Sequence, residues 1–167
     1  PLLHGGGQER GLRPGTLPVP LIVGFARAVE LCLEELPGEA ARLCELRERL
    51  LSGLRSRLDG IELNGHPQQR LPGNLNLSFA GVRSDALLAR LHDVACSSGS
   101  ACASGKSEPS HVLLALGTGE ERARSALRFG LGRGPREQDV DFALERVATA
   151  VSAERSQPGA APRARAE

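Results

Sequence analysis

The sequence predicts an α+β fold in which helices pack on one small, mostly antiparallel sheet. Three observations support this prediction. Two stretches near the start repeat apolar residues every three or four positions, which is the spacing of amphipathic helices. Residues 74–79 and 126–131 alternate polar and apolar side chains, as half-buried strands do. Short helical and strand patterns then alternate, so the helices are expected to cover the sheet.

The first part of the chain predicts a loop followed by two helices. Residues 1–16 are rich in glycine and lack a periodic apolar pattern, so we expect a loop. A first helix is expected over Leu21–Leu36 and a second over Glu39–Leu58, where leucines lie opposite many charges. Pro37 and Gly38 are expected to separate them, because proline has no N–H to donate inside a helix.

The remaining elements follow from shorter patterns. Ser84 is a candidate helix cap, and from Ser156 onward the Pro-, Ala- and Arg-rich tail is expected to be disordered. The expected elements are a strand at Gly60–Asn64, a strand at Asn74–Phe79, a helix at Asp85–His92, a strand at Val94–Cys96, a helix at His111–Leu116, a strand at Ala126–Leu131 and a helix at Glu137–Val151.

Composition excludes several classes of protein. The chain has 167 residues and a net charge of +1, and it has no basic stripe, so nucleic acid is not an expected partner. No apolar run approaches the ~18 residues of a membrane span, and no secretory pattern opens the chain, so the cytoplasm is the expected compartment. Methionine is absent, and we therefore expect a fragment, a cleavage product or a truncated gene product.

The run Val94–Lys106 predicts a mobile segment that carries a thiol. Cys102 lies among serines, glycines and alanines, which cannot pack a core and leave the backbone free to move. A reactive thiolate needs positive charge or a base nearby, and Lys106, Arg128 and His111 are the candidates. The alternative is an inert thiol in a flexible loop.

The other cysteines and the histidines predict no metal or disulfide site. Cys32 and Cys44 fall in helical patterns, as core-facing or idle thiols do, and Cys96 is expected to be buried in its strand. No cysteine and histidine spacing matches a zinc site. His111, early in a helix, is more typical of a surface residue than of a catalyst.

Two further groups are candidates for anion binding. Residues 5–16 combine glycines with Arg10, Arg13 and Thr16, and could hold a phosphate, although a turn-rich surface loop with solvated arginines explains the same composition. Arg128 takes the strand face opposite Leu127 and Phe129. A strand arginine is usually solvated, but its planar fork also suits a carboxylate.

Together these motifs resemble consecutive signatures of the cysteine desulfurases, which belong to the class V aminotransferase group of pyridoxal-phosphate enzymes. The resemblance extends to about Val151 and includes a Ser-Ser-Gly-Ser-Ala-Cys loop. The motifs that carry it are Gly5-Gly-Gly-Gln-Glu-Arg-Gly-Leu-Arg-Pro-Gly-Thr16, Asn74-Leu-Asn-Leu-Ser-Phe79, Ser97-Ser-Gly-Ser-Ala-Cys102, Glu108-Pro-Ser-His-Val-Leu113 and Leu127-Arg-Phe-Gly-Leu-Gly132.

The resemblance implies a fold type I enzyme, with residues 1–36 as the end of the large cofactor-binding domain and its connecting helix. Residues 37–153 would form the C-terminal small domain, and residues 154–167 a disordered tail. The complete enzyme would convert L-cysteine to L-alanine and a persulfide for iron–sulfur cluster or thio-cofactor synthesis. It would be a homodimer that passes sulfur to an acceptor such as an iron–sulfur scaffold.

The resemblance also implies three site residues. Cys102 matches the nucleophile that takes the sulfur, and Arg128 matches the arginine that holds the substrate carboxylate. Thr16 matches a threonine that reaches the cofactor phosphate of the other subunit. Cys96 and His111 match no catalytic position.

The sequence departs from the family at the cofactor lysine. In the family this lysine follows a Ser-x-His motif upstream of the glycine-rich loop, whereas Lys106, the sole lysine here, lies in another context. The cofactor lysine is therefore expected outside this chain, which should not catalyse desulfuration alone. Two alternatives remain, a selenocysteine lyase and a non-catalytic sulfur-carrier or dimerisation module.

Overall fold

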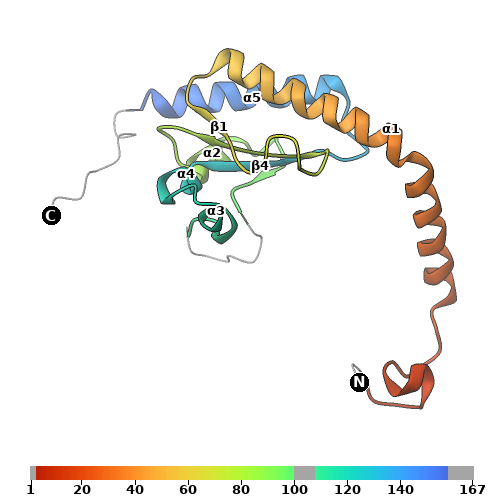
Figure 1. Ribbon diagram of the computed structural model, residues 1–167. Helices are drawn as coiled ribbons and strands as arrows, with labels where there is room; N and C mark the ends of the chain where they lie inside the picture. The colour runs from red at the N-terminus through yellow and green to blue at the C-terminus, as the bar shows by residue number, and fades with distance from the viewer. Residues whose placement is uncertain (1–2, 100–107, 158–167) are drawn as a thin grey trace. The chain divides into compact units, whose positions relative to one another are not determined.

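The computed structural model of the chain describes residues 3–99 and 108–157, and it confirms the α+β class (Figure 1). The chain divides into two compact units, Pro1–Gly38 and Glu39–Glu167. In order, the elements are the 3-10 helix η1 (Gln8–Gly11), α1 (Val19–Arg57), β1 (Ile61–Leu63), β2 (Asn74–Phe79), α2 (Ser84–Arg90), β3 (Cys96–Ser97), α3 (His111–Ala115), α4 (Glu120–Arg124), β4 (Ala126–Gly130) and α5 (Glu137–Arg155).

The expected break at Pro37 and Gly38 is wrong, because α1 continues through both residues. A proline inside a helix removes one backbone hydrogen bond and costs about 3 kcal/mol. One turn later the guanidinium of Arg42 makes two 2.8 Å bonds to the carboxylate of Glu39 and a 2.7 Å bond to the carbonyl of Pro135. We attribute the continuation to these contacts and to the leucines that α1 buries further on.

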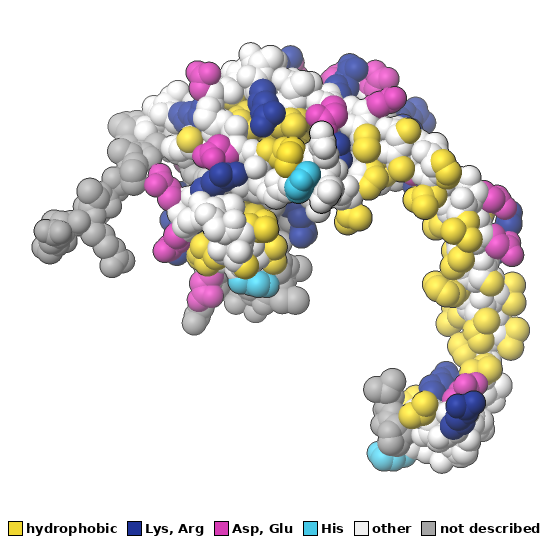
Figure 2. Space-filling model, viewed as in Figure 1, with side chains coloured by type: hydrophobic (Ala, Val, Ile, Leu, Met, Phe, Trp, Pro, Cys, Tyr) yellow, Lys and Arg dark blue, Asp and Glu magenta, His cyan; other side chains and the backbone are white. Residues whose placement is uncertain are grey.

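In the first unit, the initial half of α1 exposes apolar side chains. Leu21 and Phe25 are each 73% exposed and Leu33 is 69% exposed. Figure 2 shows hydrophobic side chains gathered along this part of the helix. A continuous exposed apolar surface on a helix is typical of a contact surface.

The second unit is built on a four-stranded antiparallel sheet in the order β1-β2-β4-β3. The central pair is β2 and β4, in which Leu77 lies opposite Leu127 and Asn76 lies opposite Arg128. β3 adds to the other side of β4 and places Ser97 opposite Arg128. The mostly antiparallel sheet expected from the sequence is therefore confirmed.

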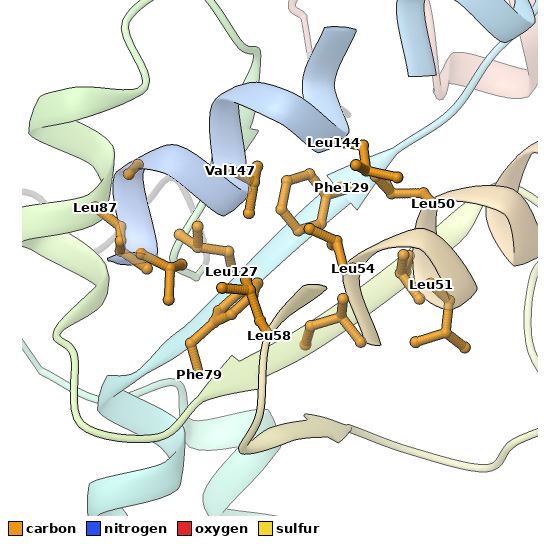
Figure 3. Close-up of a cluster of buried hydrophobic side chains, with 14 of the residues drawn as sticks. Leu50, Leu51, Leu54, Leu58, Phe79, Leu87, Leu127, Phe129, Leu144 and Val147 are labelled. Atoms are coloured by element: carbon orange, nitrogen blue, oxygen red, sulfur yellow. The ribbon is translucent and has the colours of Figure 1, made fainter. Parts of the chain in front are cut away.

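The apolar face of this sheet is covered by the second half of α1 and by α5, with α2 beside α5 (Figures 1 and 3). Leu54, Phe79 and Val147 meet there and have no exposed surface. Large apolar residues alternate with polar or small ones along β2 and β4, and successive strand residues point to opposite sides of a sheet, so the large apolar residues all lie on this face. The fully or almost fully buried strand residues of this cluster are Leu75, Leu77, Phe79, Leu127 and Phe129.

The opposite face of the sheet carries α3 and α4 over part of its area (Figure 1). A small apolar cluster of Leu113, Ala123 and Ala126 joins these helices to β4. Helix α4 was not expected, because its sequence Glu-Glu-Arg-Ala-Arg has a single apolar residue and no readable period. In the structure, Ala123 of α4 is buried, and the carbonyl of Arg122 accepts a 2.8 Å hydrogen bond from Ser78 Oγ of β2.

Several boundaries differ from the sequence predictions. Arg83, not Ser84, stands at the N-cap of α2, and Ser84 is the first helical residue and is buried. β3 begins at Cys96 instead of Val94, because only Cys96 and Ser97 pair with β4. The last helix continues to Arg155, whose guanidinium bonds the carbonyls of Asp59 and Ala80.

Candidate functional site

The polar face of the sheet borders a cavity of about 350 Å³. Its size lies in the range of small-molecule sites. The described lining contains two arginines, one histidine and several amides, and none of these lining residues is acidic. The lining residues are Asn64, Gly65, His66, Gln69, Arg70, Leu71, Asn74, Asn76, Gly99, Ser110, Val112, Leu113, Leu116 and Arg128.

Arg128 enters this cavity from the middle of β4. Its neighbours Leu127 and Phe129 are 0% and 3% exposed on the apolar face, so the alternation expected around Arg128 is confirmed. Within the described residues no hydrogen bond or ion pair occupies its guanidinium. Beyond it, a Cβ built on Gly130 would meet no atom within 4 Å. Among the described residues, nothing therefore competes with a ligand for this guanidinium, and the position beside it at Gly130 is open.

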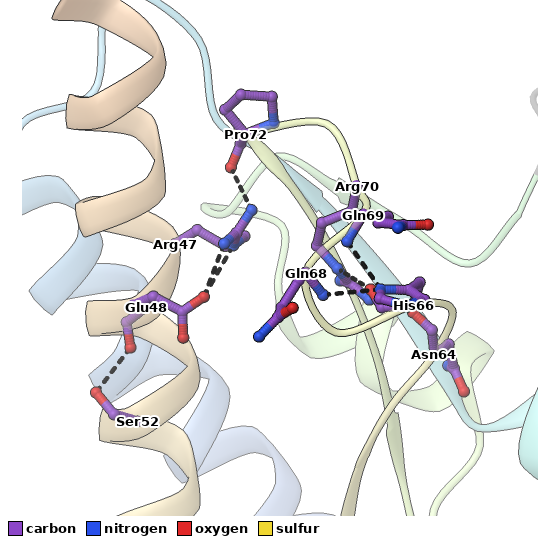
Figure 4. Close-up of polar contacts among 9 residues, drawn as sticks. All are labelled: Arg47, Glu48, Ser52, Asn64, His66, Gln68, Gln69, Arg70 and Pro72. Carbon is purple, nitrogen blue, oxygen red and sulfur yellow. Dashed lines mark hydrogen bonds and ion pairs between the residues drawn. The ribbon is translucent and has the colours of Figure 1, made fainter.

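The loop between β1 and β2 forms one wall of the cavity and is fixed by its own polar groups (Figure 4). The Nδ1 atom of His66 accepts the backbone N–H of Gln68 at 3.1 Å and of Gln69 at 2.8 Å. A neutral His66 ring therefore carries its proton on Nε2. Arg47 reaches this loop from α1 and donates to the carbonyl of Pro72 at 3.2 Å.

Arg70 is the second arginine of the lining. Its guanidinium donates to the carbonyls of His66 at 2.8 Å and of Asn64 at 2.7 Å. Burial, and then repulsion from Arg47, lower the pKa of Arg70 below its usual value. These bonds stabilise the loop that forms the cavity wall, and Arg70 also adds positive charge to the cavity.

A buried polar network lies beside the cavity on the same sheet face. Arg122 of α4 donates from Nε to Asn64 Oδ1 at 2.8 Å and makes an ion pair with Glu62 at 2.6 Å. Asn64 Nδ2 donates in turn to Asn76 Oδ1 at 2.7 Å and to Ser78 Oγ at 2.8 Å. This network explains why Ser78 is only 2% exposed on the polar face.

Two residues close to Cys102 in sequence line this cavity. They are Gly99, which lies within the run Val94–Lys106, and Ser110, which follows that run. Cys102 and Lys106 themselves lie outside the described residues. His111 begins α3 and is exposed, and it is not among the described lining residues, although its neighbours Ser110 and Val112 are.

Cys96 is half-buried, where the sequence had indicated a buried residue. It lies opposite Phe129 in the sheet and packs against the main apolar cluster. Burial raises the pKa of its thiol above the usual value. Cys96 is therefore a poor nucleophile on the face away from Arg128.

Thr16 belongs to the first unit and is exposed. The guanidinium of Arg13 donates from Nη1 to the carbonyls of Gly15 and Thr16, both at 3.0 Å, so this arginine closes its own loop and is not simply solvated. Glu9 and Arg10 have φ angles of 51° and 56°, a left-handed conformation that few side chains adopt. The loop thus holds a strained backbone and an exposed hydroxyl.

The residues present fit only part of a pyridoxal-phosphate site. The hydroxyl of Thr16 suits a phosphate oxygen, and the guanidinium of Arg128 suits the carboxylate of an amino acid. A Schiff base needs a lysine, and none of the described residues is a lysine. Within the described part, no helix combines the length and apolar character that crossing a membrane requires.

The fold and the cavity together define an α+β module with two arginines in the described lining of its cavity. The family described as aminotransferase class-V matches residues 4–142, and the chain belongs to that family. The cysteine desulfurase IscS of Rickettsia africae is 47% identical over 151 residues, and the cysteine desulfurase IscS of Rickettsia rickettsii is also 47% identical over 151 residues. Both alignments cover 90% of this chain, and the chain spans about 37% of the length of these relatives.

Solved structures give the same picture. A NifS-like protein superposes with a TM-score of 0.76 at 36% identity, over 91% of this chain and 39% of that one. DndA from Streptomyces lividans superposes with a TM-score of 0.57 at 41% identity, over 78% of this chain and 36% of that one. The resemblance to the cysteine desulfurase family seen in the motifs is confirmed.

Sequence reasoning identified Arg128 but missed the amide network. Asn64 directly follows β1, Asn76 lies on β2 and Arg122 lies on α4, so only the assembled fold brings them together. The one local signal was Asn76, a polar residue in the middle of a strand whose neighbours are leucines.

Proposed function

We propose that this chain is the part of a pyridoxal-phosphate-dependent cysteine desulfurase that supplies the sulfur-accepting thiol and the substrate carboxylate clamp. The observation that carries the proposal is the position of Arg128. It lines a cavity whose described lining has no acidic residue, and Gly99 and Ser110, which precede and follow Cys102 in sequence, line the same cavity. The 47% identity to a cysteine desulfurase supports the same activity.

Arg128 holds the carboxylate of L-cysteine in this proposal. A guanidinium presents two parallel N–H donors that match the two oxygens of a carboxylate. Its lack of a described partner leaves both donors available. In this proposal the carboxylate of L-cysteine is held at β4, and its sulfur atom reacts with Cys102.

Cys102 takes the sulfur. Its thiolate attacks the substrate sulfur, so that an S–S bond forms while the substrate C–S bond breaks. The electron pair of the broken bond goes to the substrate carbon, which takes up a proton and gives L-alanine, and the enzyme keeps a persulfide. The cofactor, when bound, draws electrons from the substrate and so permits the C–S bond to break.

The cofactor lysine lies outside this chain in our proposal, because Lys106 is the only lysine and stands in the Ser-, Gly- and Ala-rich segment. Thr16 contacts the cofactor phosphate of the other subunit of a homodimer. The exposed apolar side chains on the first half of α1 support a contact of this kind, either with that subunit or with the rest of the enzyme.

The proposed division of the chain follows the same scheme. Residues 1–36 end the large domain, residues 37–153 form the small domain, and residues 154–167 form a tail. The compact units Pro1–Gly38 and Glu39–Glu167 support a boundary near residue 37. The persulfide passes to an acceptor protein such as an iron–sulfur scaffold, in the cytoplasm, where thiols stay reduced.

The experiment that tests this proposal measures L-alanine formed from L-cysteine and from L-selenocysteine by the complete enzyme. We expect alanine from cysteine, and no turnover of cysteine when Cys102 is replaced by serine. A strong preference for selenocysteine that survives Cys102→Ser would favour the lyase alternative. No alanine from either substrate would favour the sulfur-carrier alternative.

The lysine assignment has its own test. The chain of 167 residues, incubated with pyridoxal phosphate and gel-filtered, should show no visible absorption band from a lysine-bound cofactor. A stoichiometric band that is lost in Lys106→Ala would contradict the assignment.

A further inference from the structure

The amide network beside the cavity has a fixed direction. A guanidinium has donors and no acceptor, so Asn64 must turn its Oδ1 toward Arg122, at 2.8 Å. Its Nδ2 then faces Asn76 and Ser78. Because Nδ2 can only donate, Asn76 must present its own Oδ1 to Asn64, at 2.7 Å. The arginine at one end therefore sets the orientation of both amides.

This orientation leaves the Nδ2 group of Asn76 for the cavity. No described residue accepts a hydrogen bond from it, while every buried side-chain nitrogen or oxygen in the described part has a partner. The Nδ2 atom is therefore not a buried atom, and Asn76 lines the cavity. Its two N–H donors reach accessible space on the polar face of the sheet.

Asn76 and Arg128 lie directly opposite each other on β2 and β4. Side chains in such a pair share one face, with Cβ atoms about 4.5–5.5 Å apart. The Oδ1 of Asn76 is engaged by Asn64, so it does not compete for the Arg128 guanidinium. The free donors of these two residues lie side by side, and such an arrangement suits the two acceptor oxygens of a carboxylate.

We propose that Asn76 is a second positioning residue for the substrate carboxylate, donating from Nδ2 beside Arg128, and that Arg122 and Asn64 hold it in that orientation. The inference rests on the proposed function, since it takes the carboxylate to bind at Arg128. The inference adds a source of ligand specificity. A carboxylate has two acceptor oxygens, one for the arginine and one for the amide, whereas an anion with a single acceptor atom could bind only one of them. The competing explanation is a purely structural network that fastens α4 to the sheet.

The test is an NMR titration of the full 167-residue chain with L-alanine, the product that carries the same carboxylate. In the unsubstituted chain, we expect the side-chain amide resonances of Asn76 to shift together with the backbone resonances of β4, and methylamine, which lacks the carboxylate, to shift neither. A network with only a structural role would leave the Asn76 side-chain amide unmoved by L-alanine, and that result overturns the inference.

Variants separate the inference from the proposed function. Asn76→Ala should weaken L-alanine binding about tenfold or more, the effect of losing one hydrogen bond to a charged group. Asn74→Ala is the matched control, because Asn74 lines the same cavity two residues earlier but has no side-chain bond in the network. It should change the affinity by less than about threefold, since no bond to the ligand is lost.

Each pattern of results has a defined meaning. Loss of binding in Arg128→Ala with an unchanged affinity in Asn76→Ala would overturn the inference and retain the carboxylate clamp. No carboxylate-dependent shift at β4 in the unsubstituted chain would overturn the inference, whereas the clamp at Arg128 is tested separately by the KM of the Arg128 variants in the complete enzyme. If Asn76→Ala does not fold, the Asn76 side-chain shifts in the unsubstituted chain decide the question.

Discussion

Gly73 is the residue at which one added methyl group should do the most damage to the sheet beside the cavity. It directly precedes β2, and its carbonyl accepts the backbone N–H of Leu131 at 2.8 Å. A Cβ at this position would overlap the carbonyl oxygen of Leu131 and lie 3.1 Å from its carbonyl carbon. The φ angle of Gly73 is not in the left-handed region, so the conflict in Gly73→Ala is steric alone.

The cost follows from these contacts. Backbone atoms cannot rotate away as a side chain does, so the ends of β2 and β4 must separate. Overpacking of this kind costs about 1–3 kcal/mol, and loss of the Leu131 to Gly73 hydrogen bond adds about 0.5–1.5 kcal/mol. We expect Gly73→Ala to lower the free energy of unfolding by about 1.5–4.5 kcal/mol. For a chain of this size the drop in Tm is roughly 3–18 °C.

Thermal and urea unfolding followed by circular dichroism measure this effect. The matched control is Gly130→Ala on β4, because a Cβ there meets no atom within 4 Å. Alanine in place of an unhindered strand glycine should leave stability unchanged or raise it by about 0.5–1 kcal/mol. Equal stability of Gly73→Ala and Gly130→Ala would refute the close approach of these two strand ends.

The remaining predictions concern the site and the charges around it. In the complete enzyme, Arg128→Ala and Arg128→Lys should both raise KM for L-cysteine, and the loss of binding free energy should be about 2–4 kcal/mol. The loss should be smaller in Arg128→Lys, which keeps the positive charge. Near-normal KM in both variants would count against the clamp. Peptide mapping after brief alkylation should find Cys102 labelled first and Cys96 last, because burial raises the pKa of the Cys96 thiol; early labelling of Cys96 would contradict its packing. The Arg49 guanidinium holds the pKa of Asp141 below its usual value of 3.8, so the ion pair stabilises the fold at neutral pH and this contribution is lost as the pH falls below that value. Asp141→Asn should therefore flatten the decline of unfolding free energy below about pH 4, and an unchanged acid slope would show that the pair is not linked to folding.

The parts of the fold that sequence predicted are those governed by local pattern. β2 and β4 were found because Leu75, Leu77 and Phe79 alternate with polar residues, and this alternation is imposed by one apolar layer of helices. The continuity of α1 through Pro37 was missed, because the bond from Arg42 to the carbonyl of Pro135, which is 93 residues away in sequence, is not visible in a local window.

At the site, too, the residues that follow a local pattern were predicted and those that depend on distant contacts were not. Arg128 was identified from its own strand, where the flanking Leu127 and Phe129 fix the opposite face. The orientation of Asn76 depends on Asn64 and Arg122, which are 58 residues apart in sequence and meet only after β1, β2 and α4 have assembled. The sequence pattern of one strand cannot predict these contacts between distant residues.

The central claim is that the thiol of Cys102 receives the sulfur of a substrate whose carboxylate is held at Arg128. Mass spectrometry of the complete enzyme after a single exposure to L-cysteine tests it most directly, with digestion under conditions that preserve persulfides. The account predicts one added sulfur atom on the peptide that contains Cys102, and none on that peptide in Arg128→Ala at the same substrate concentration. Added sulfur on the peptides of Cys32, Cys44 or Cys96 instead would contradict it.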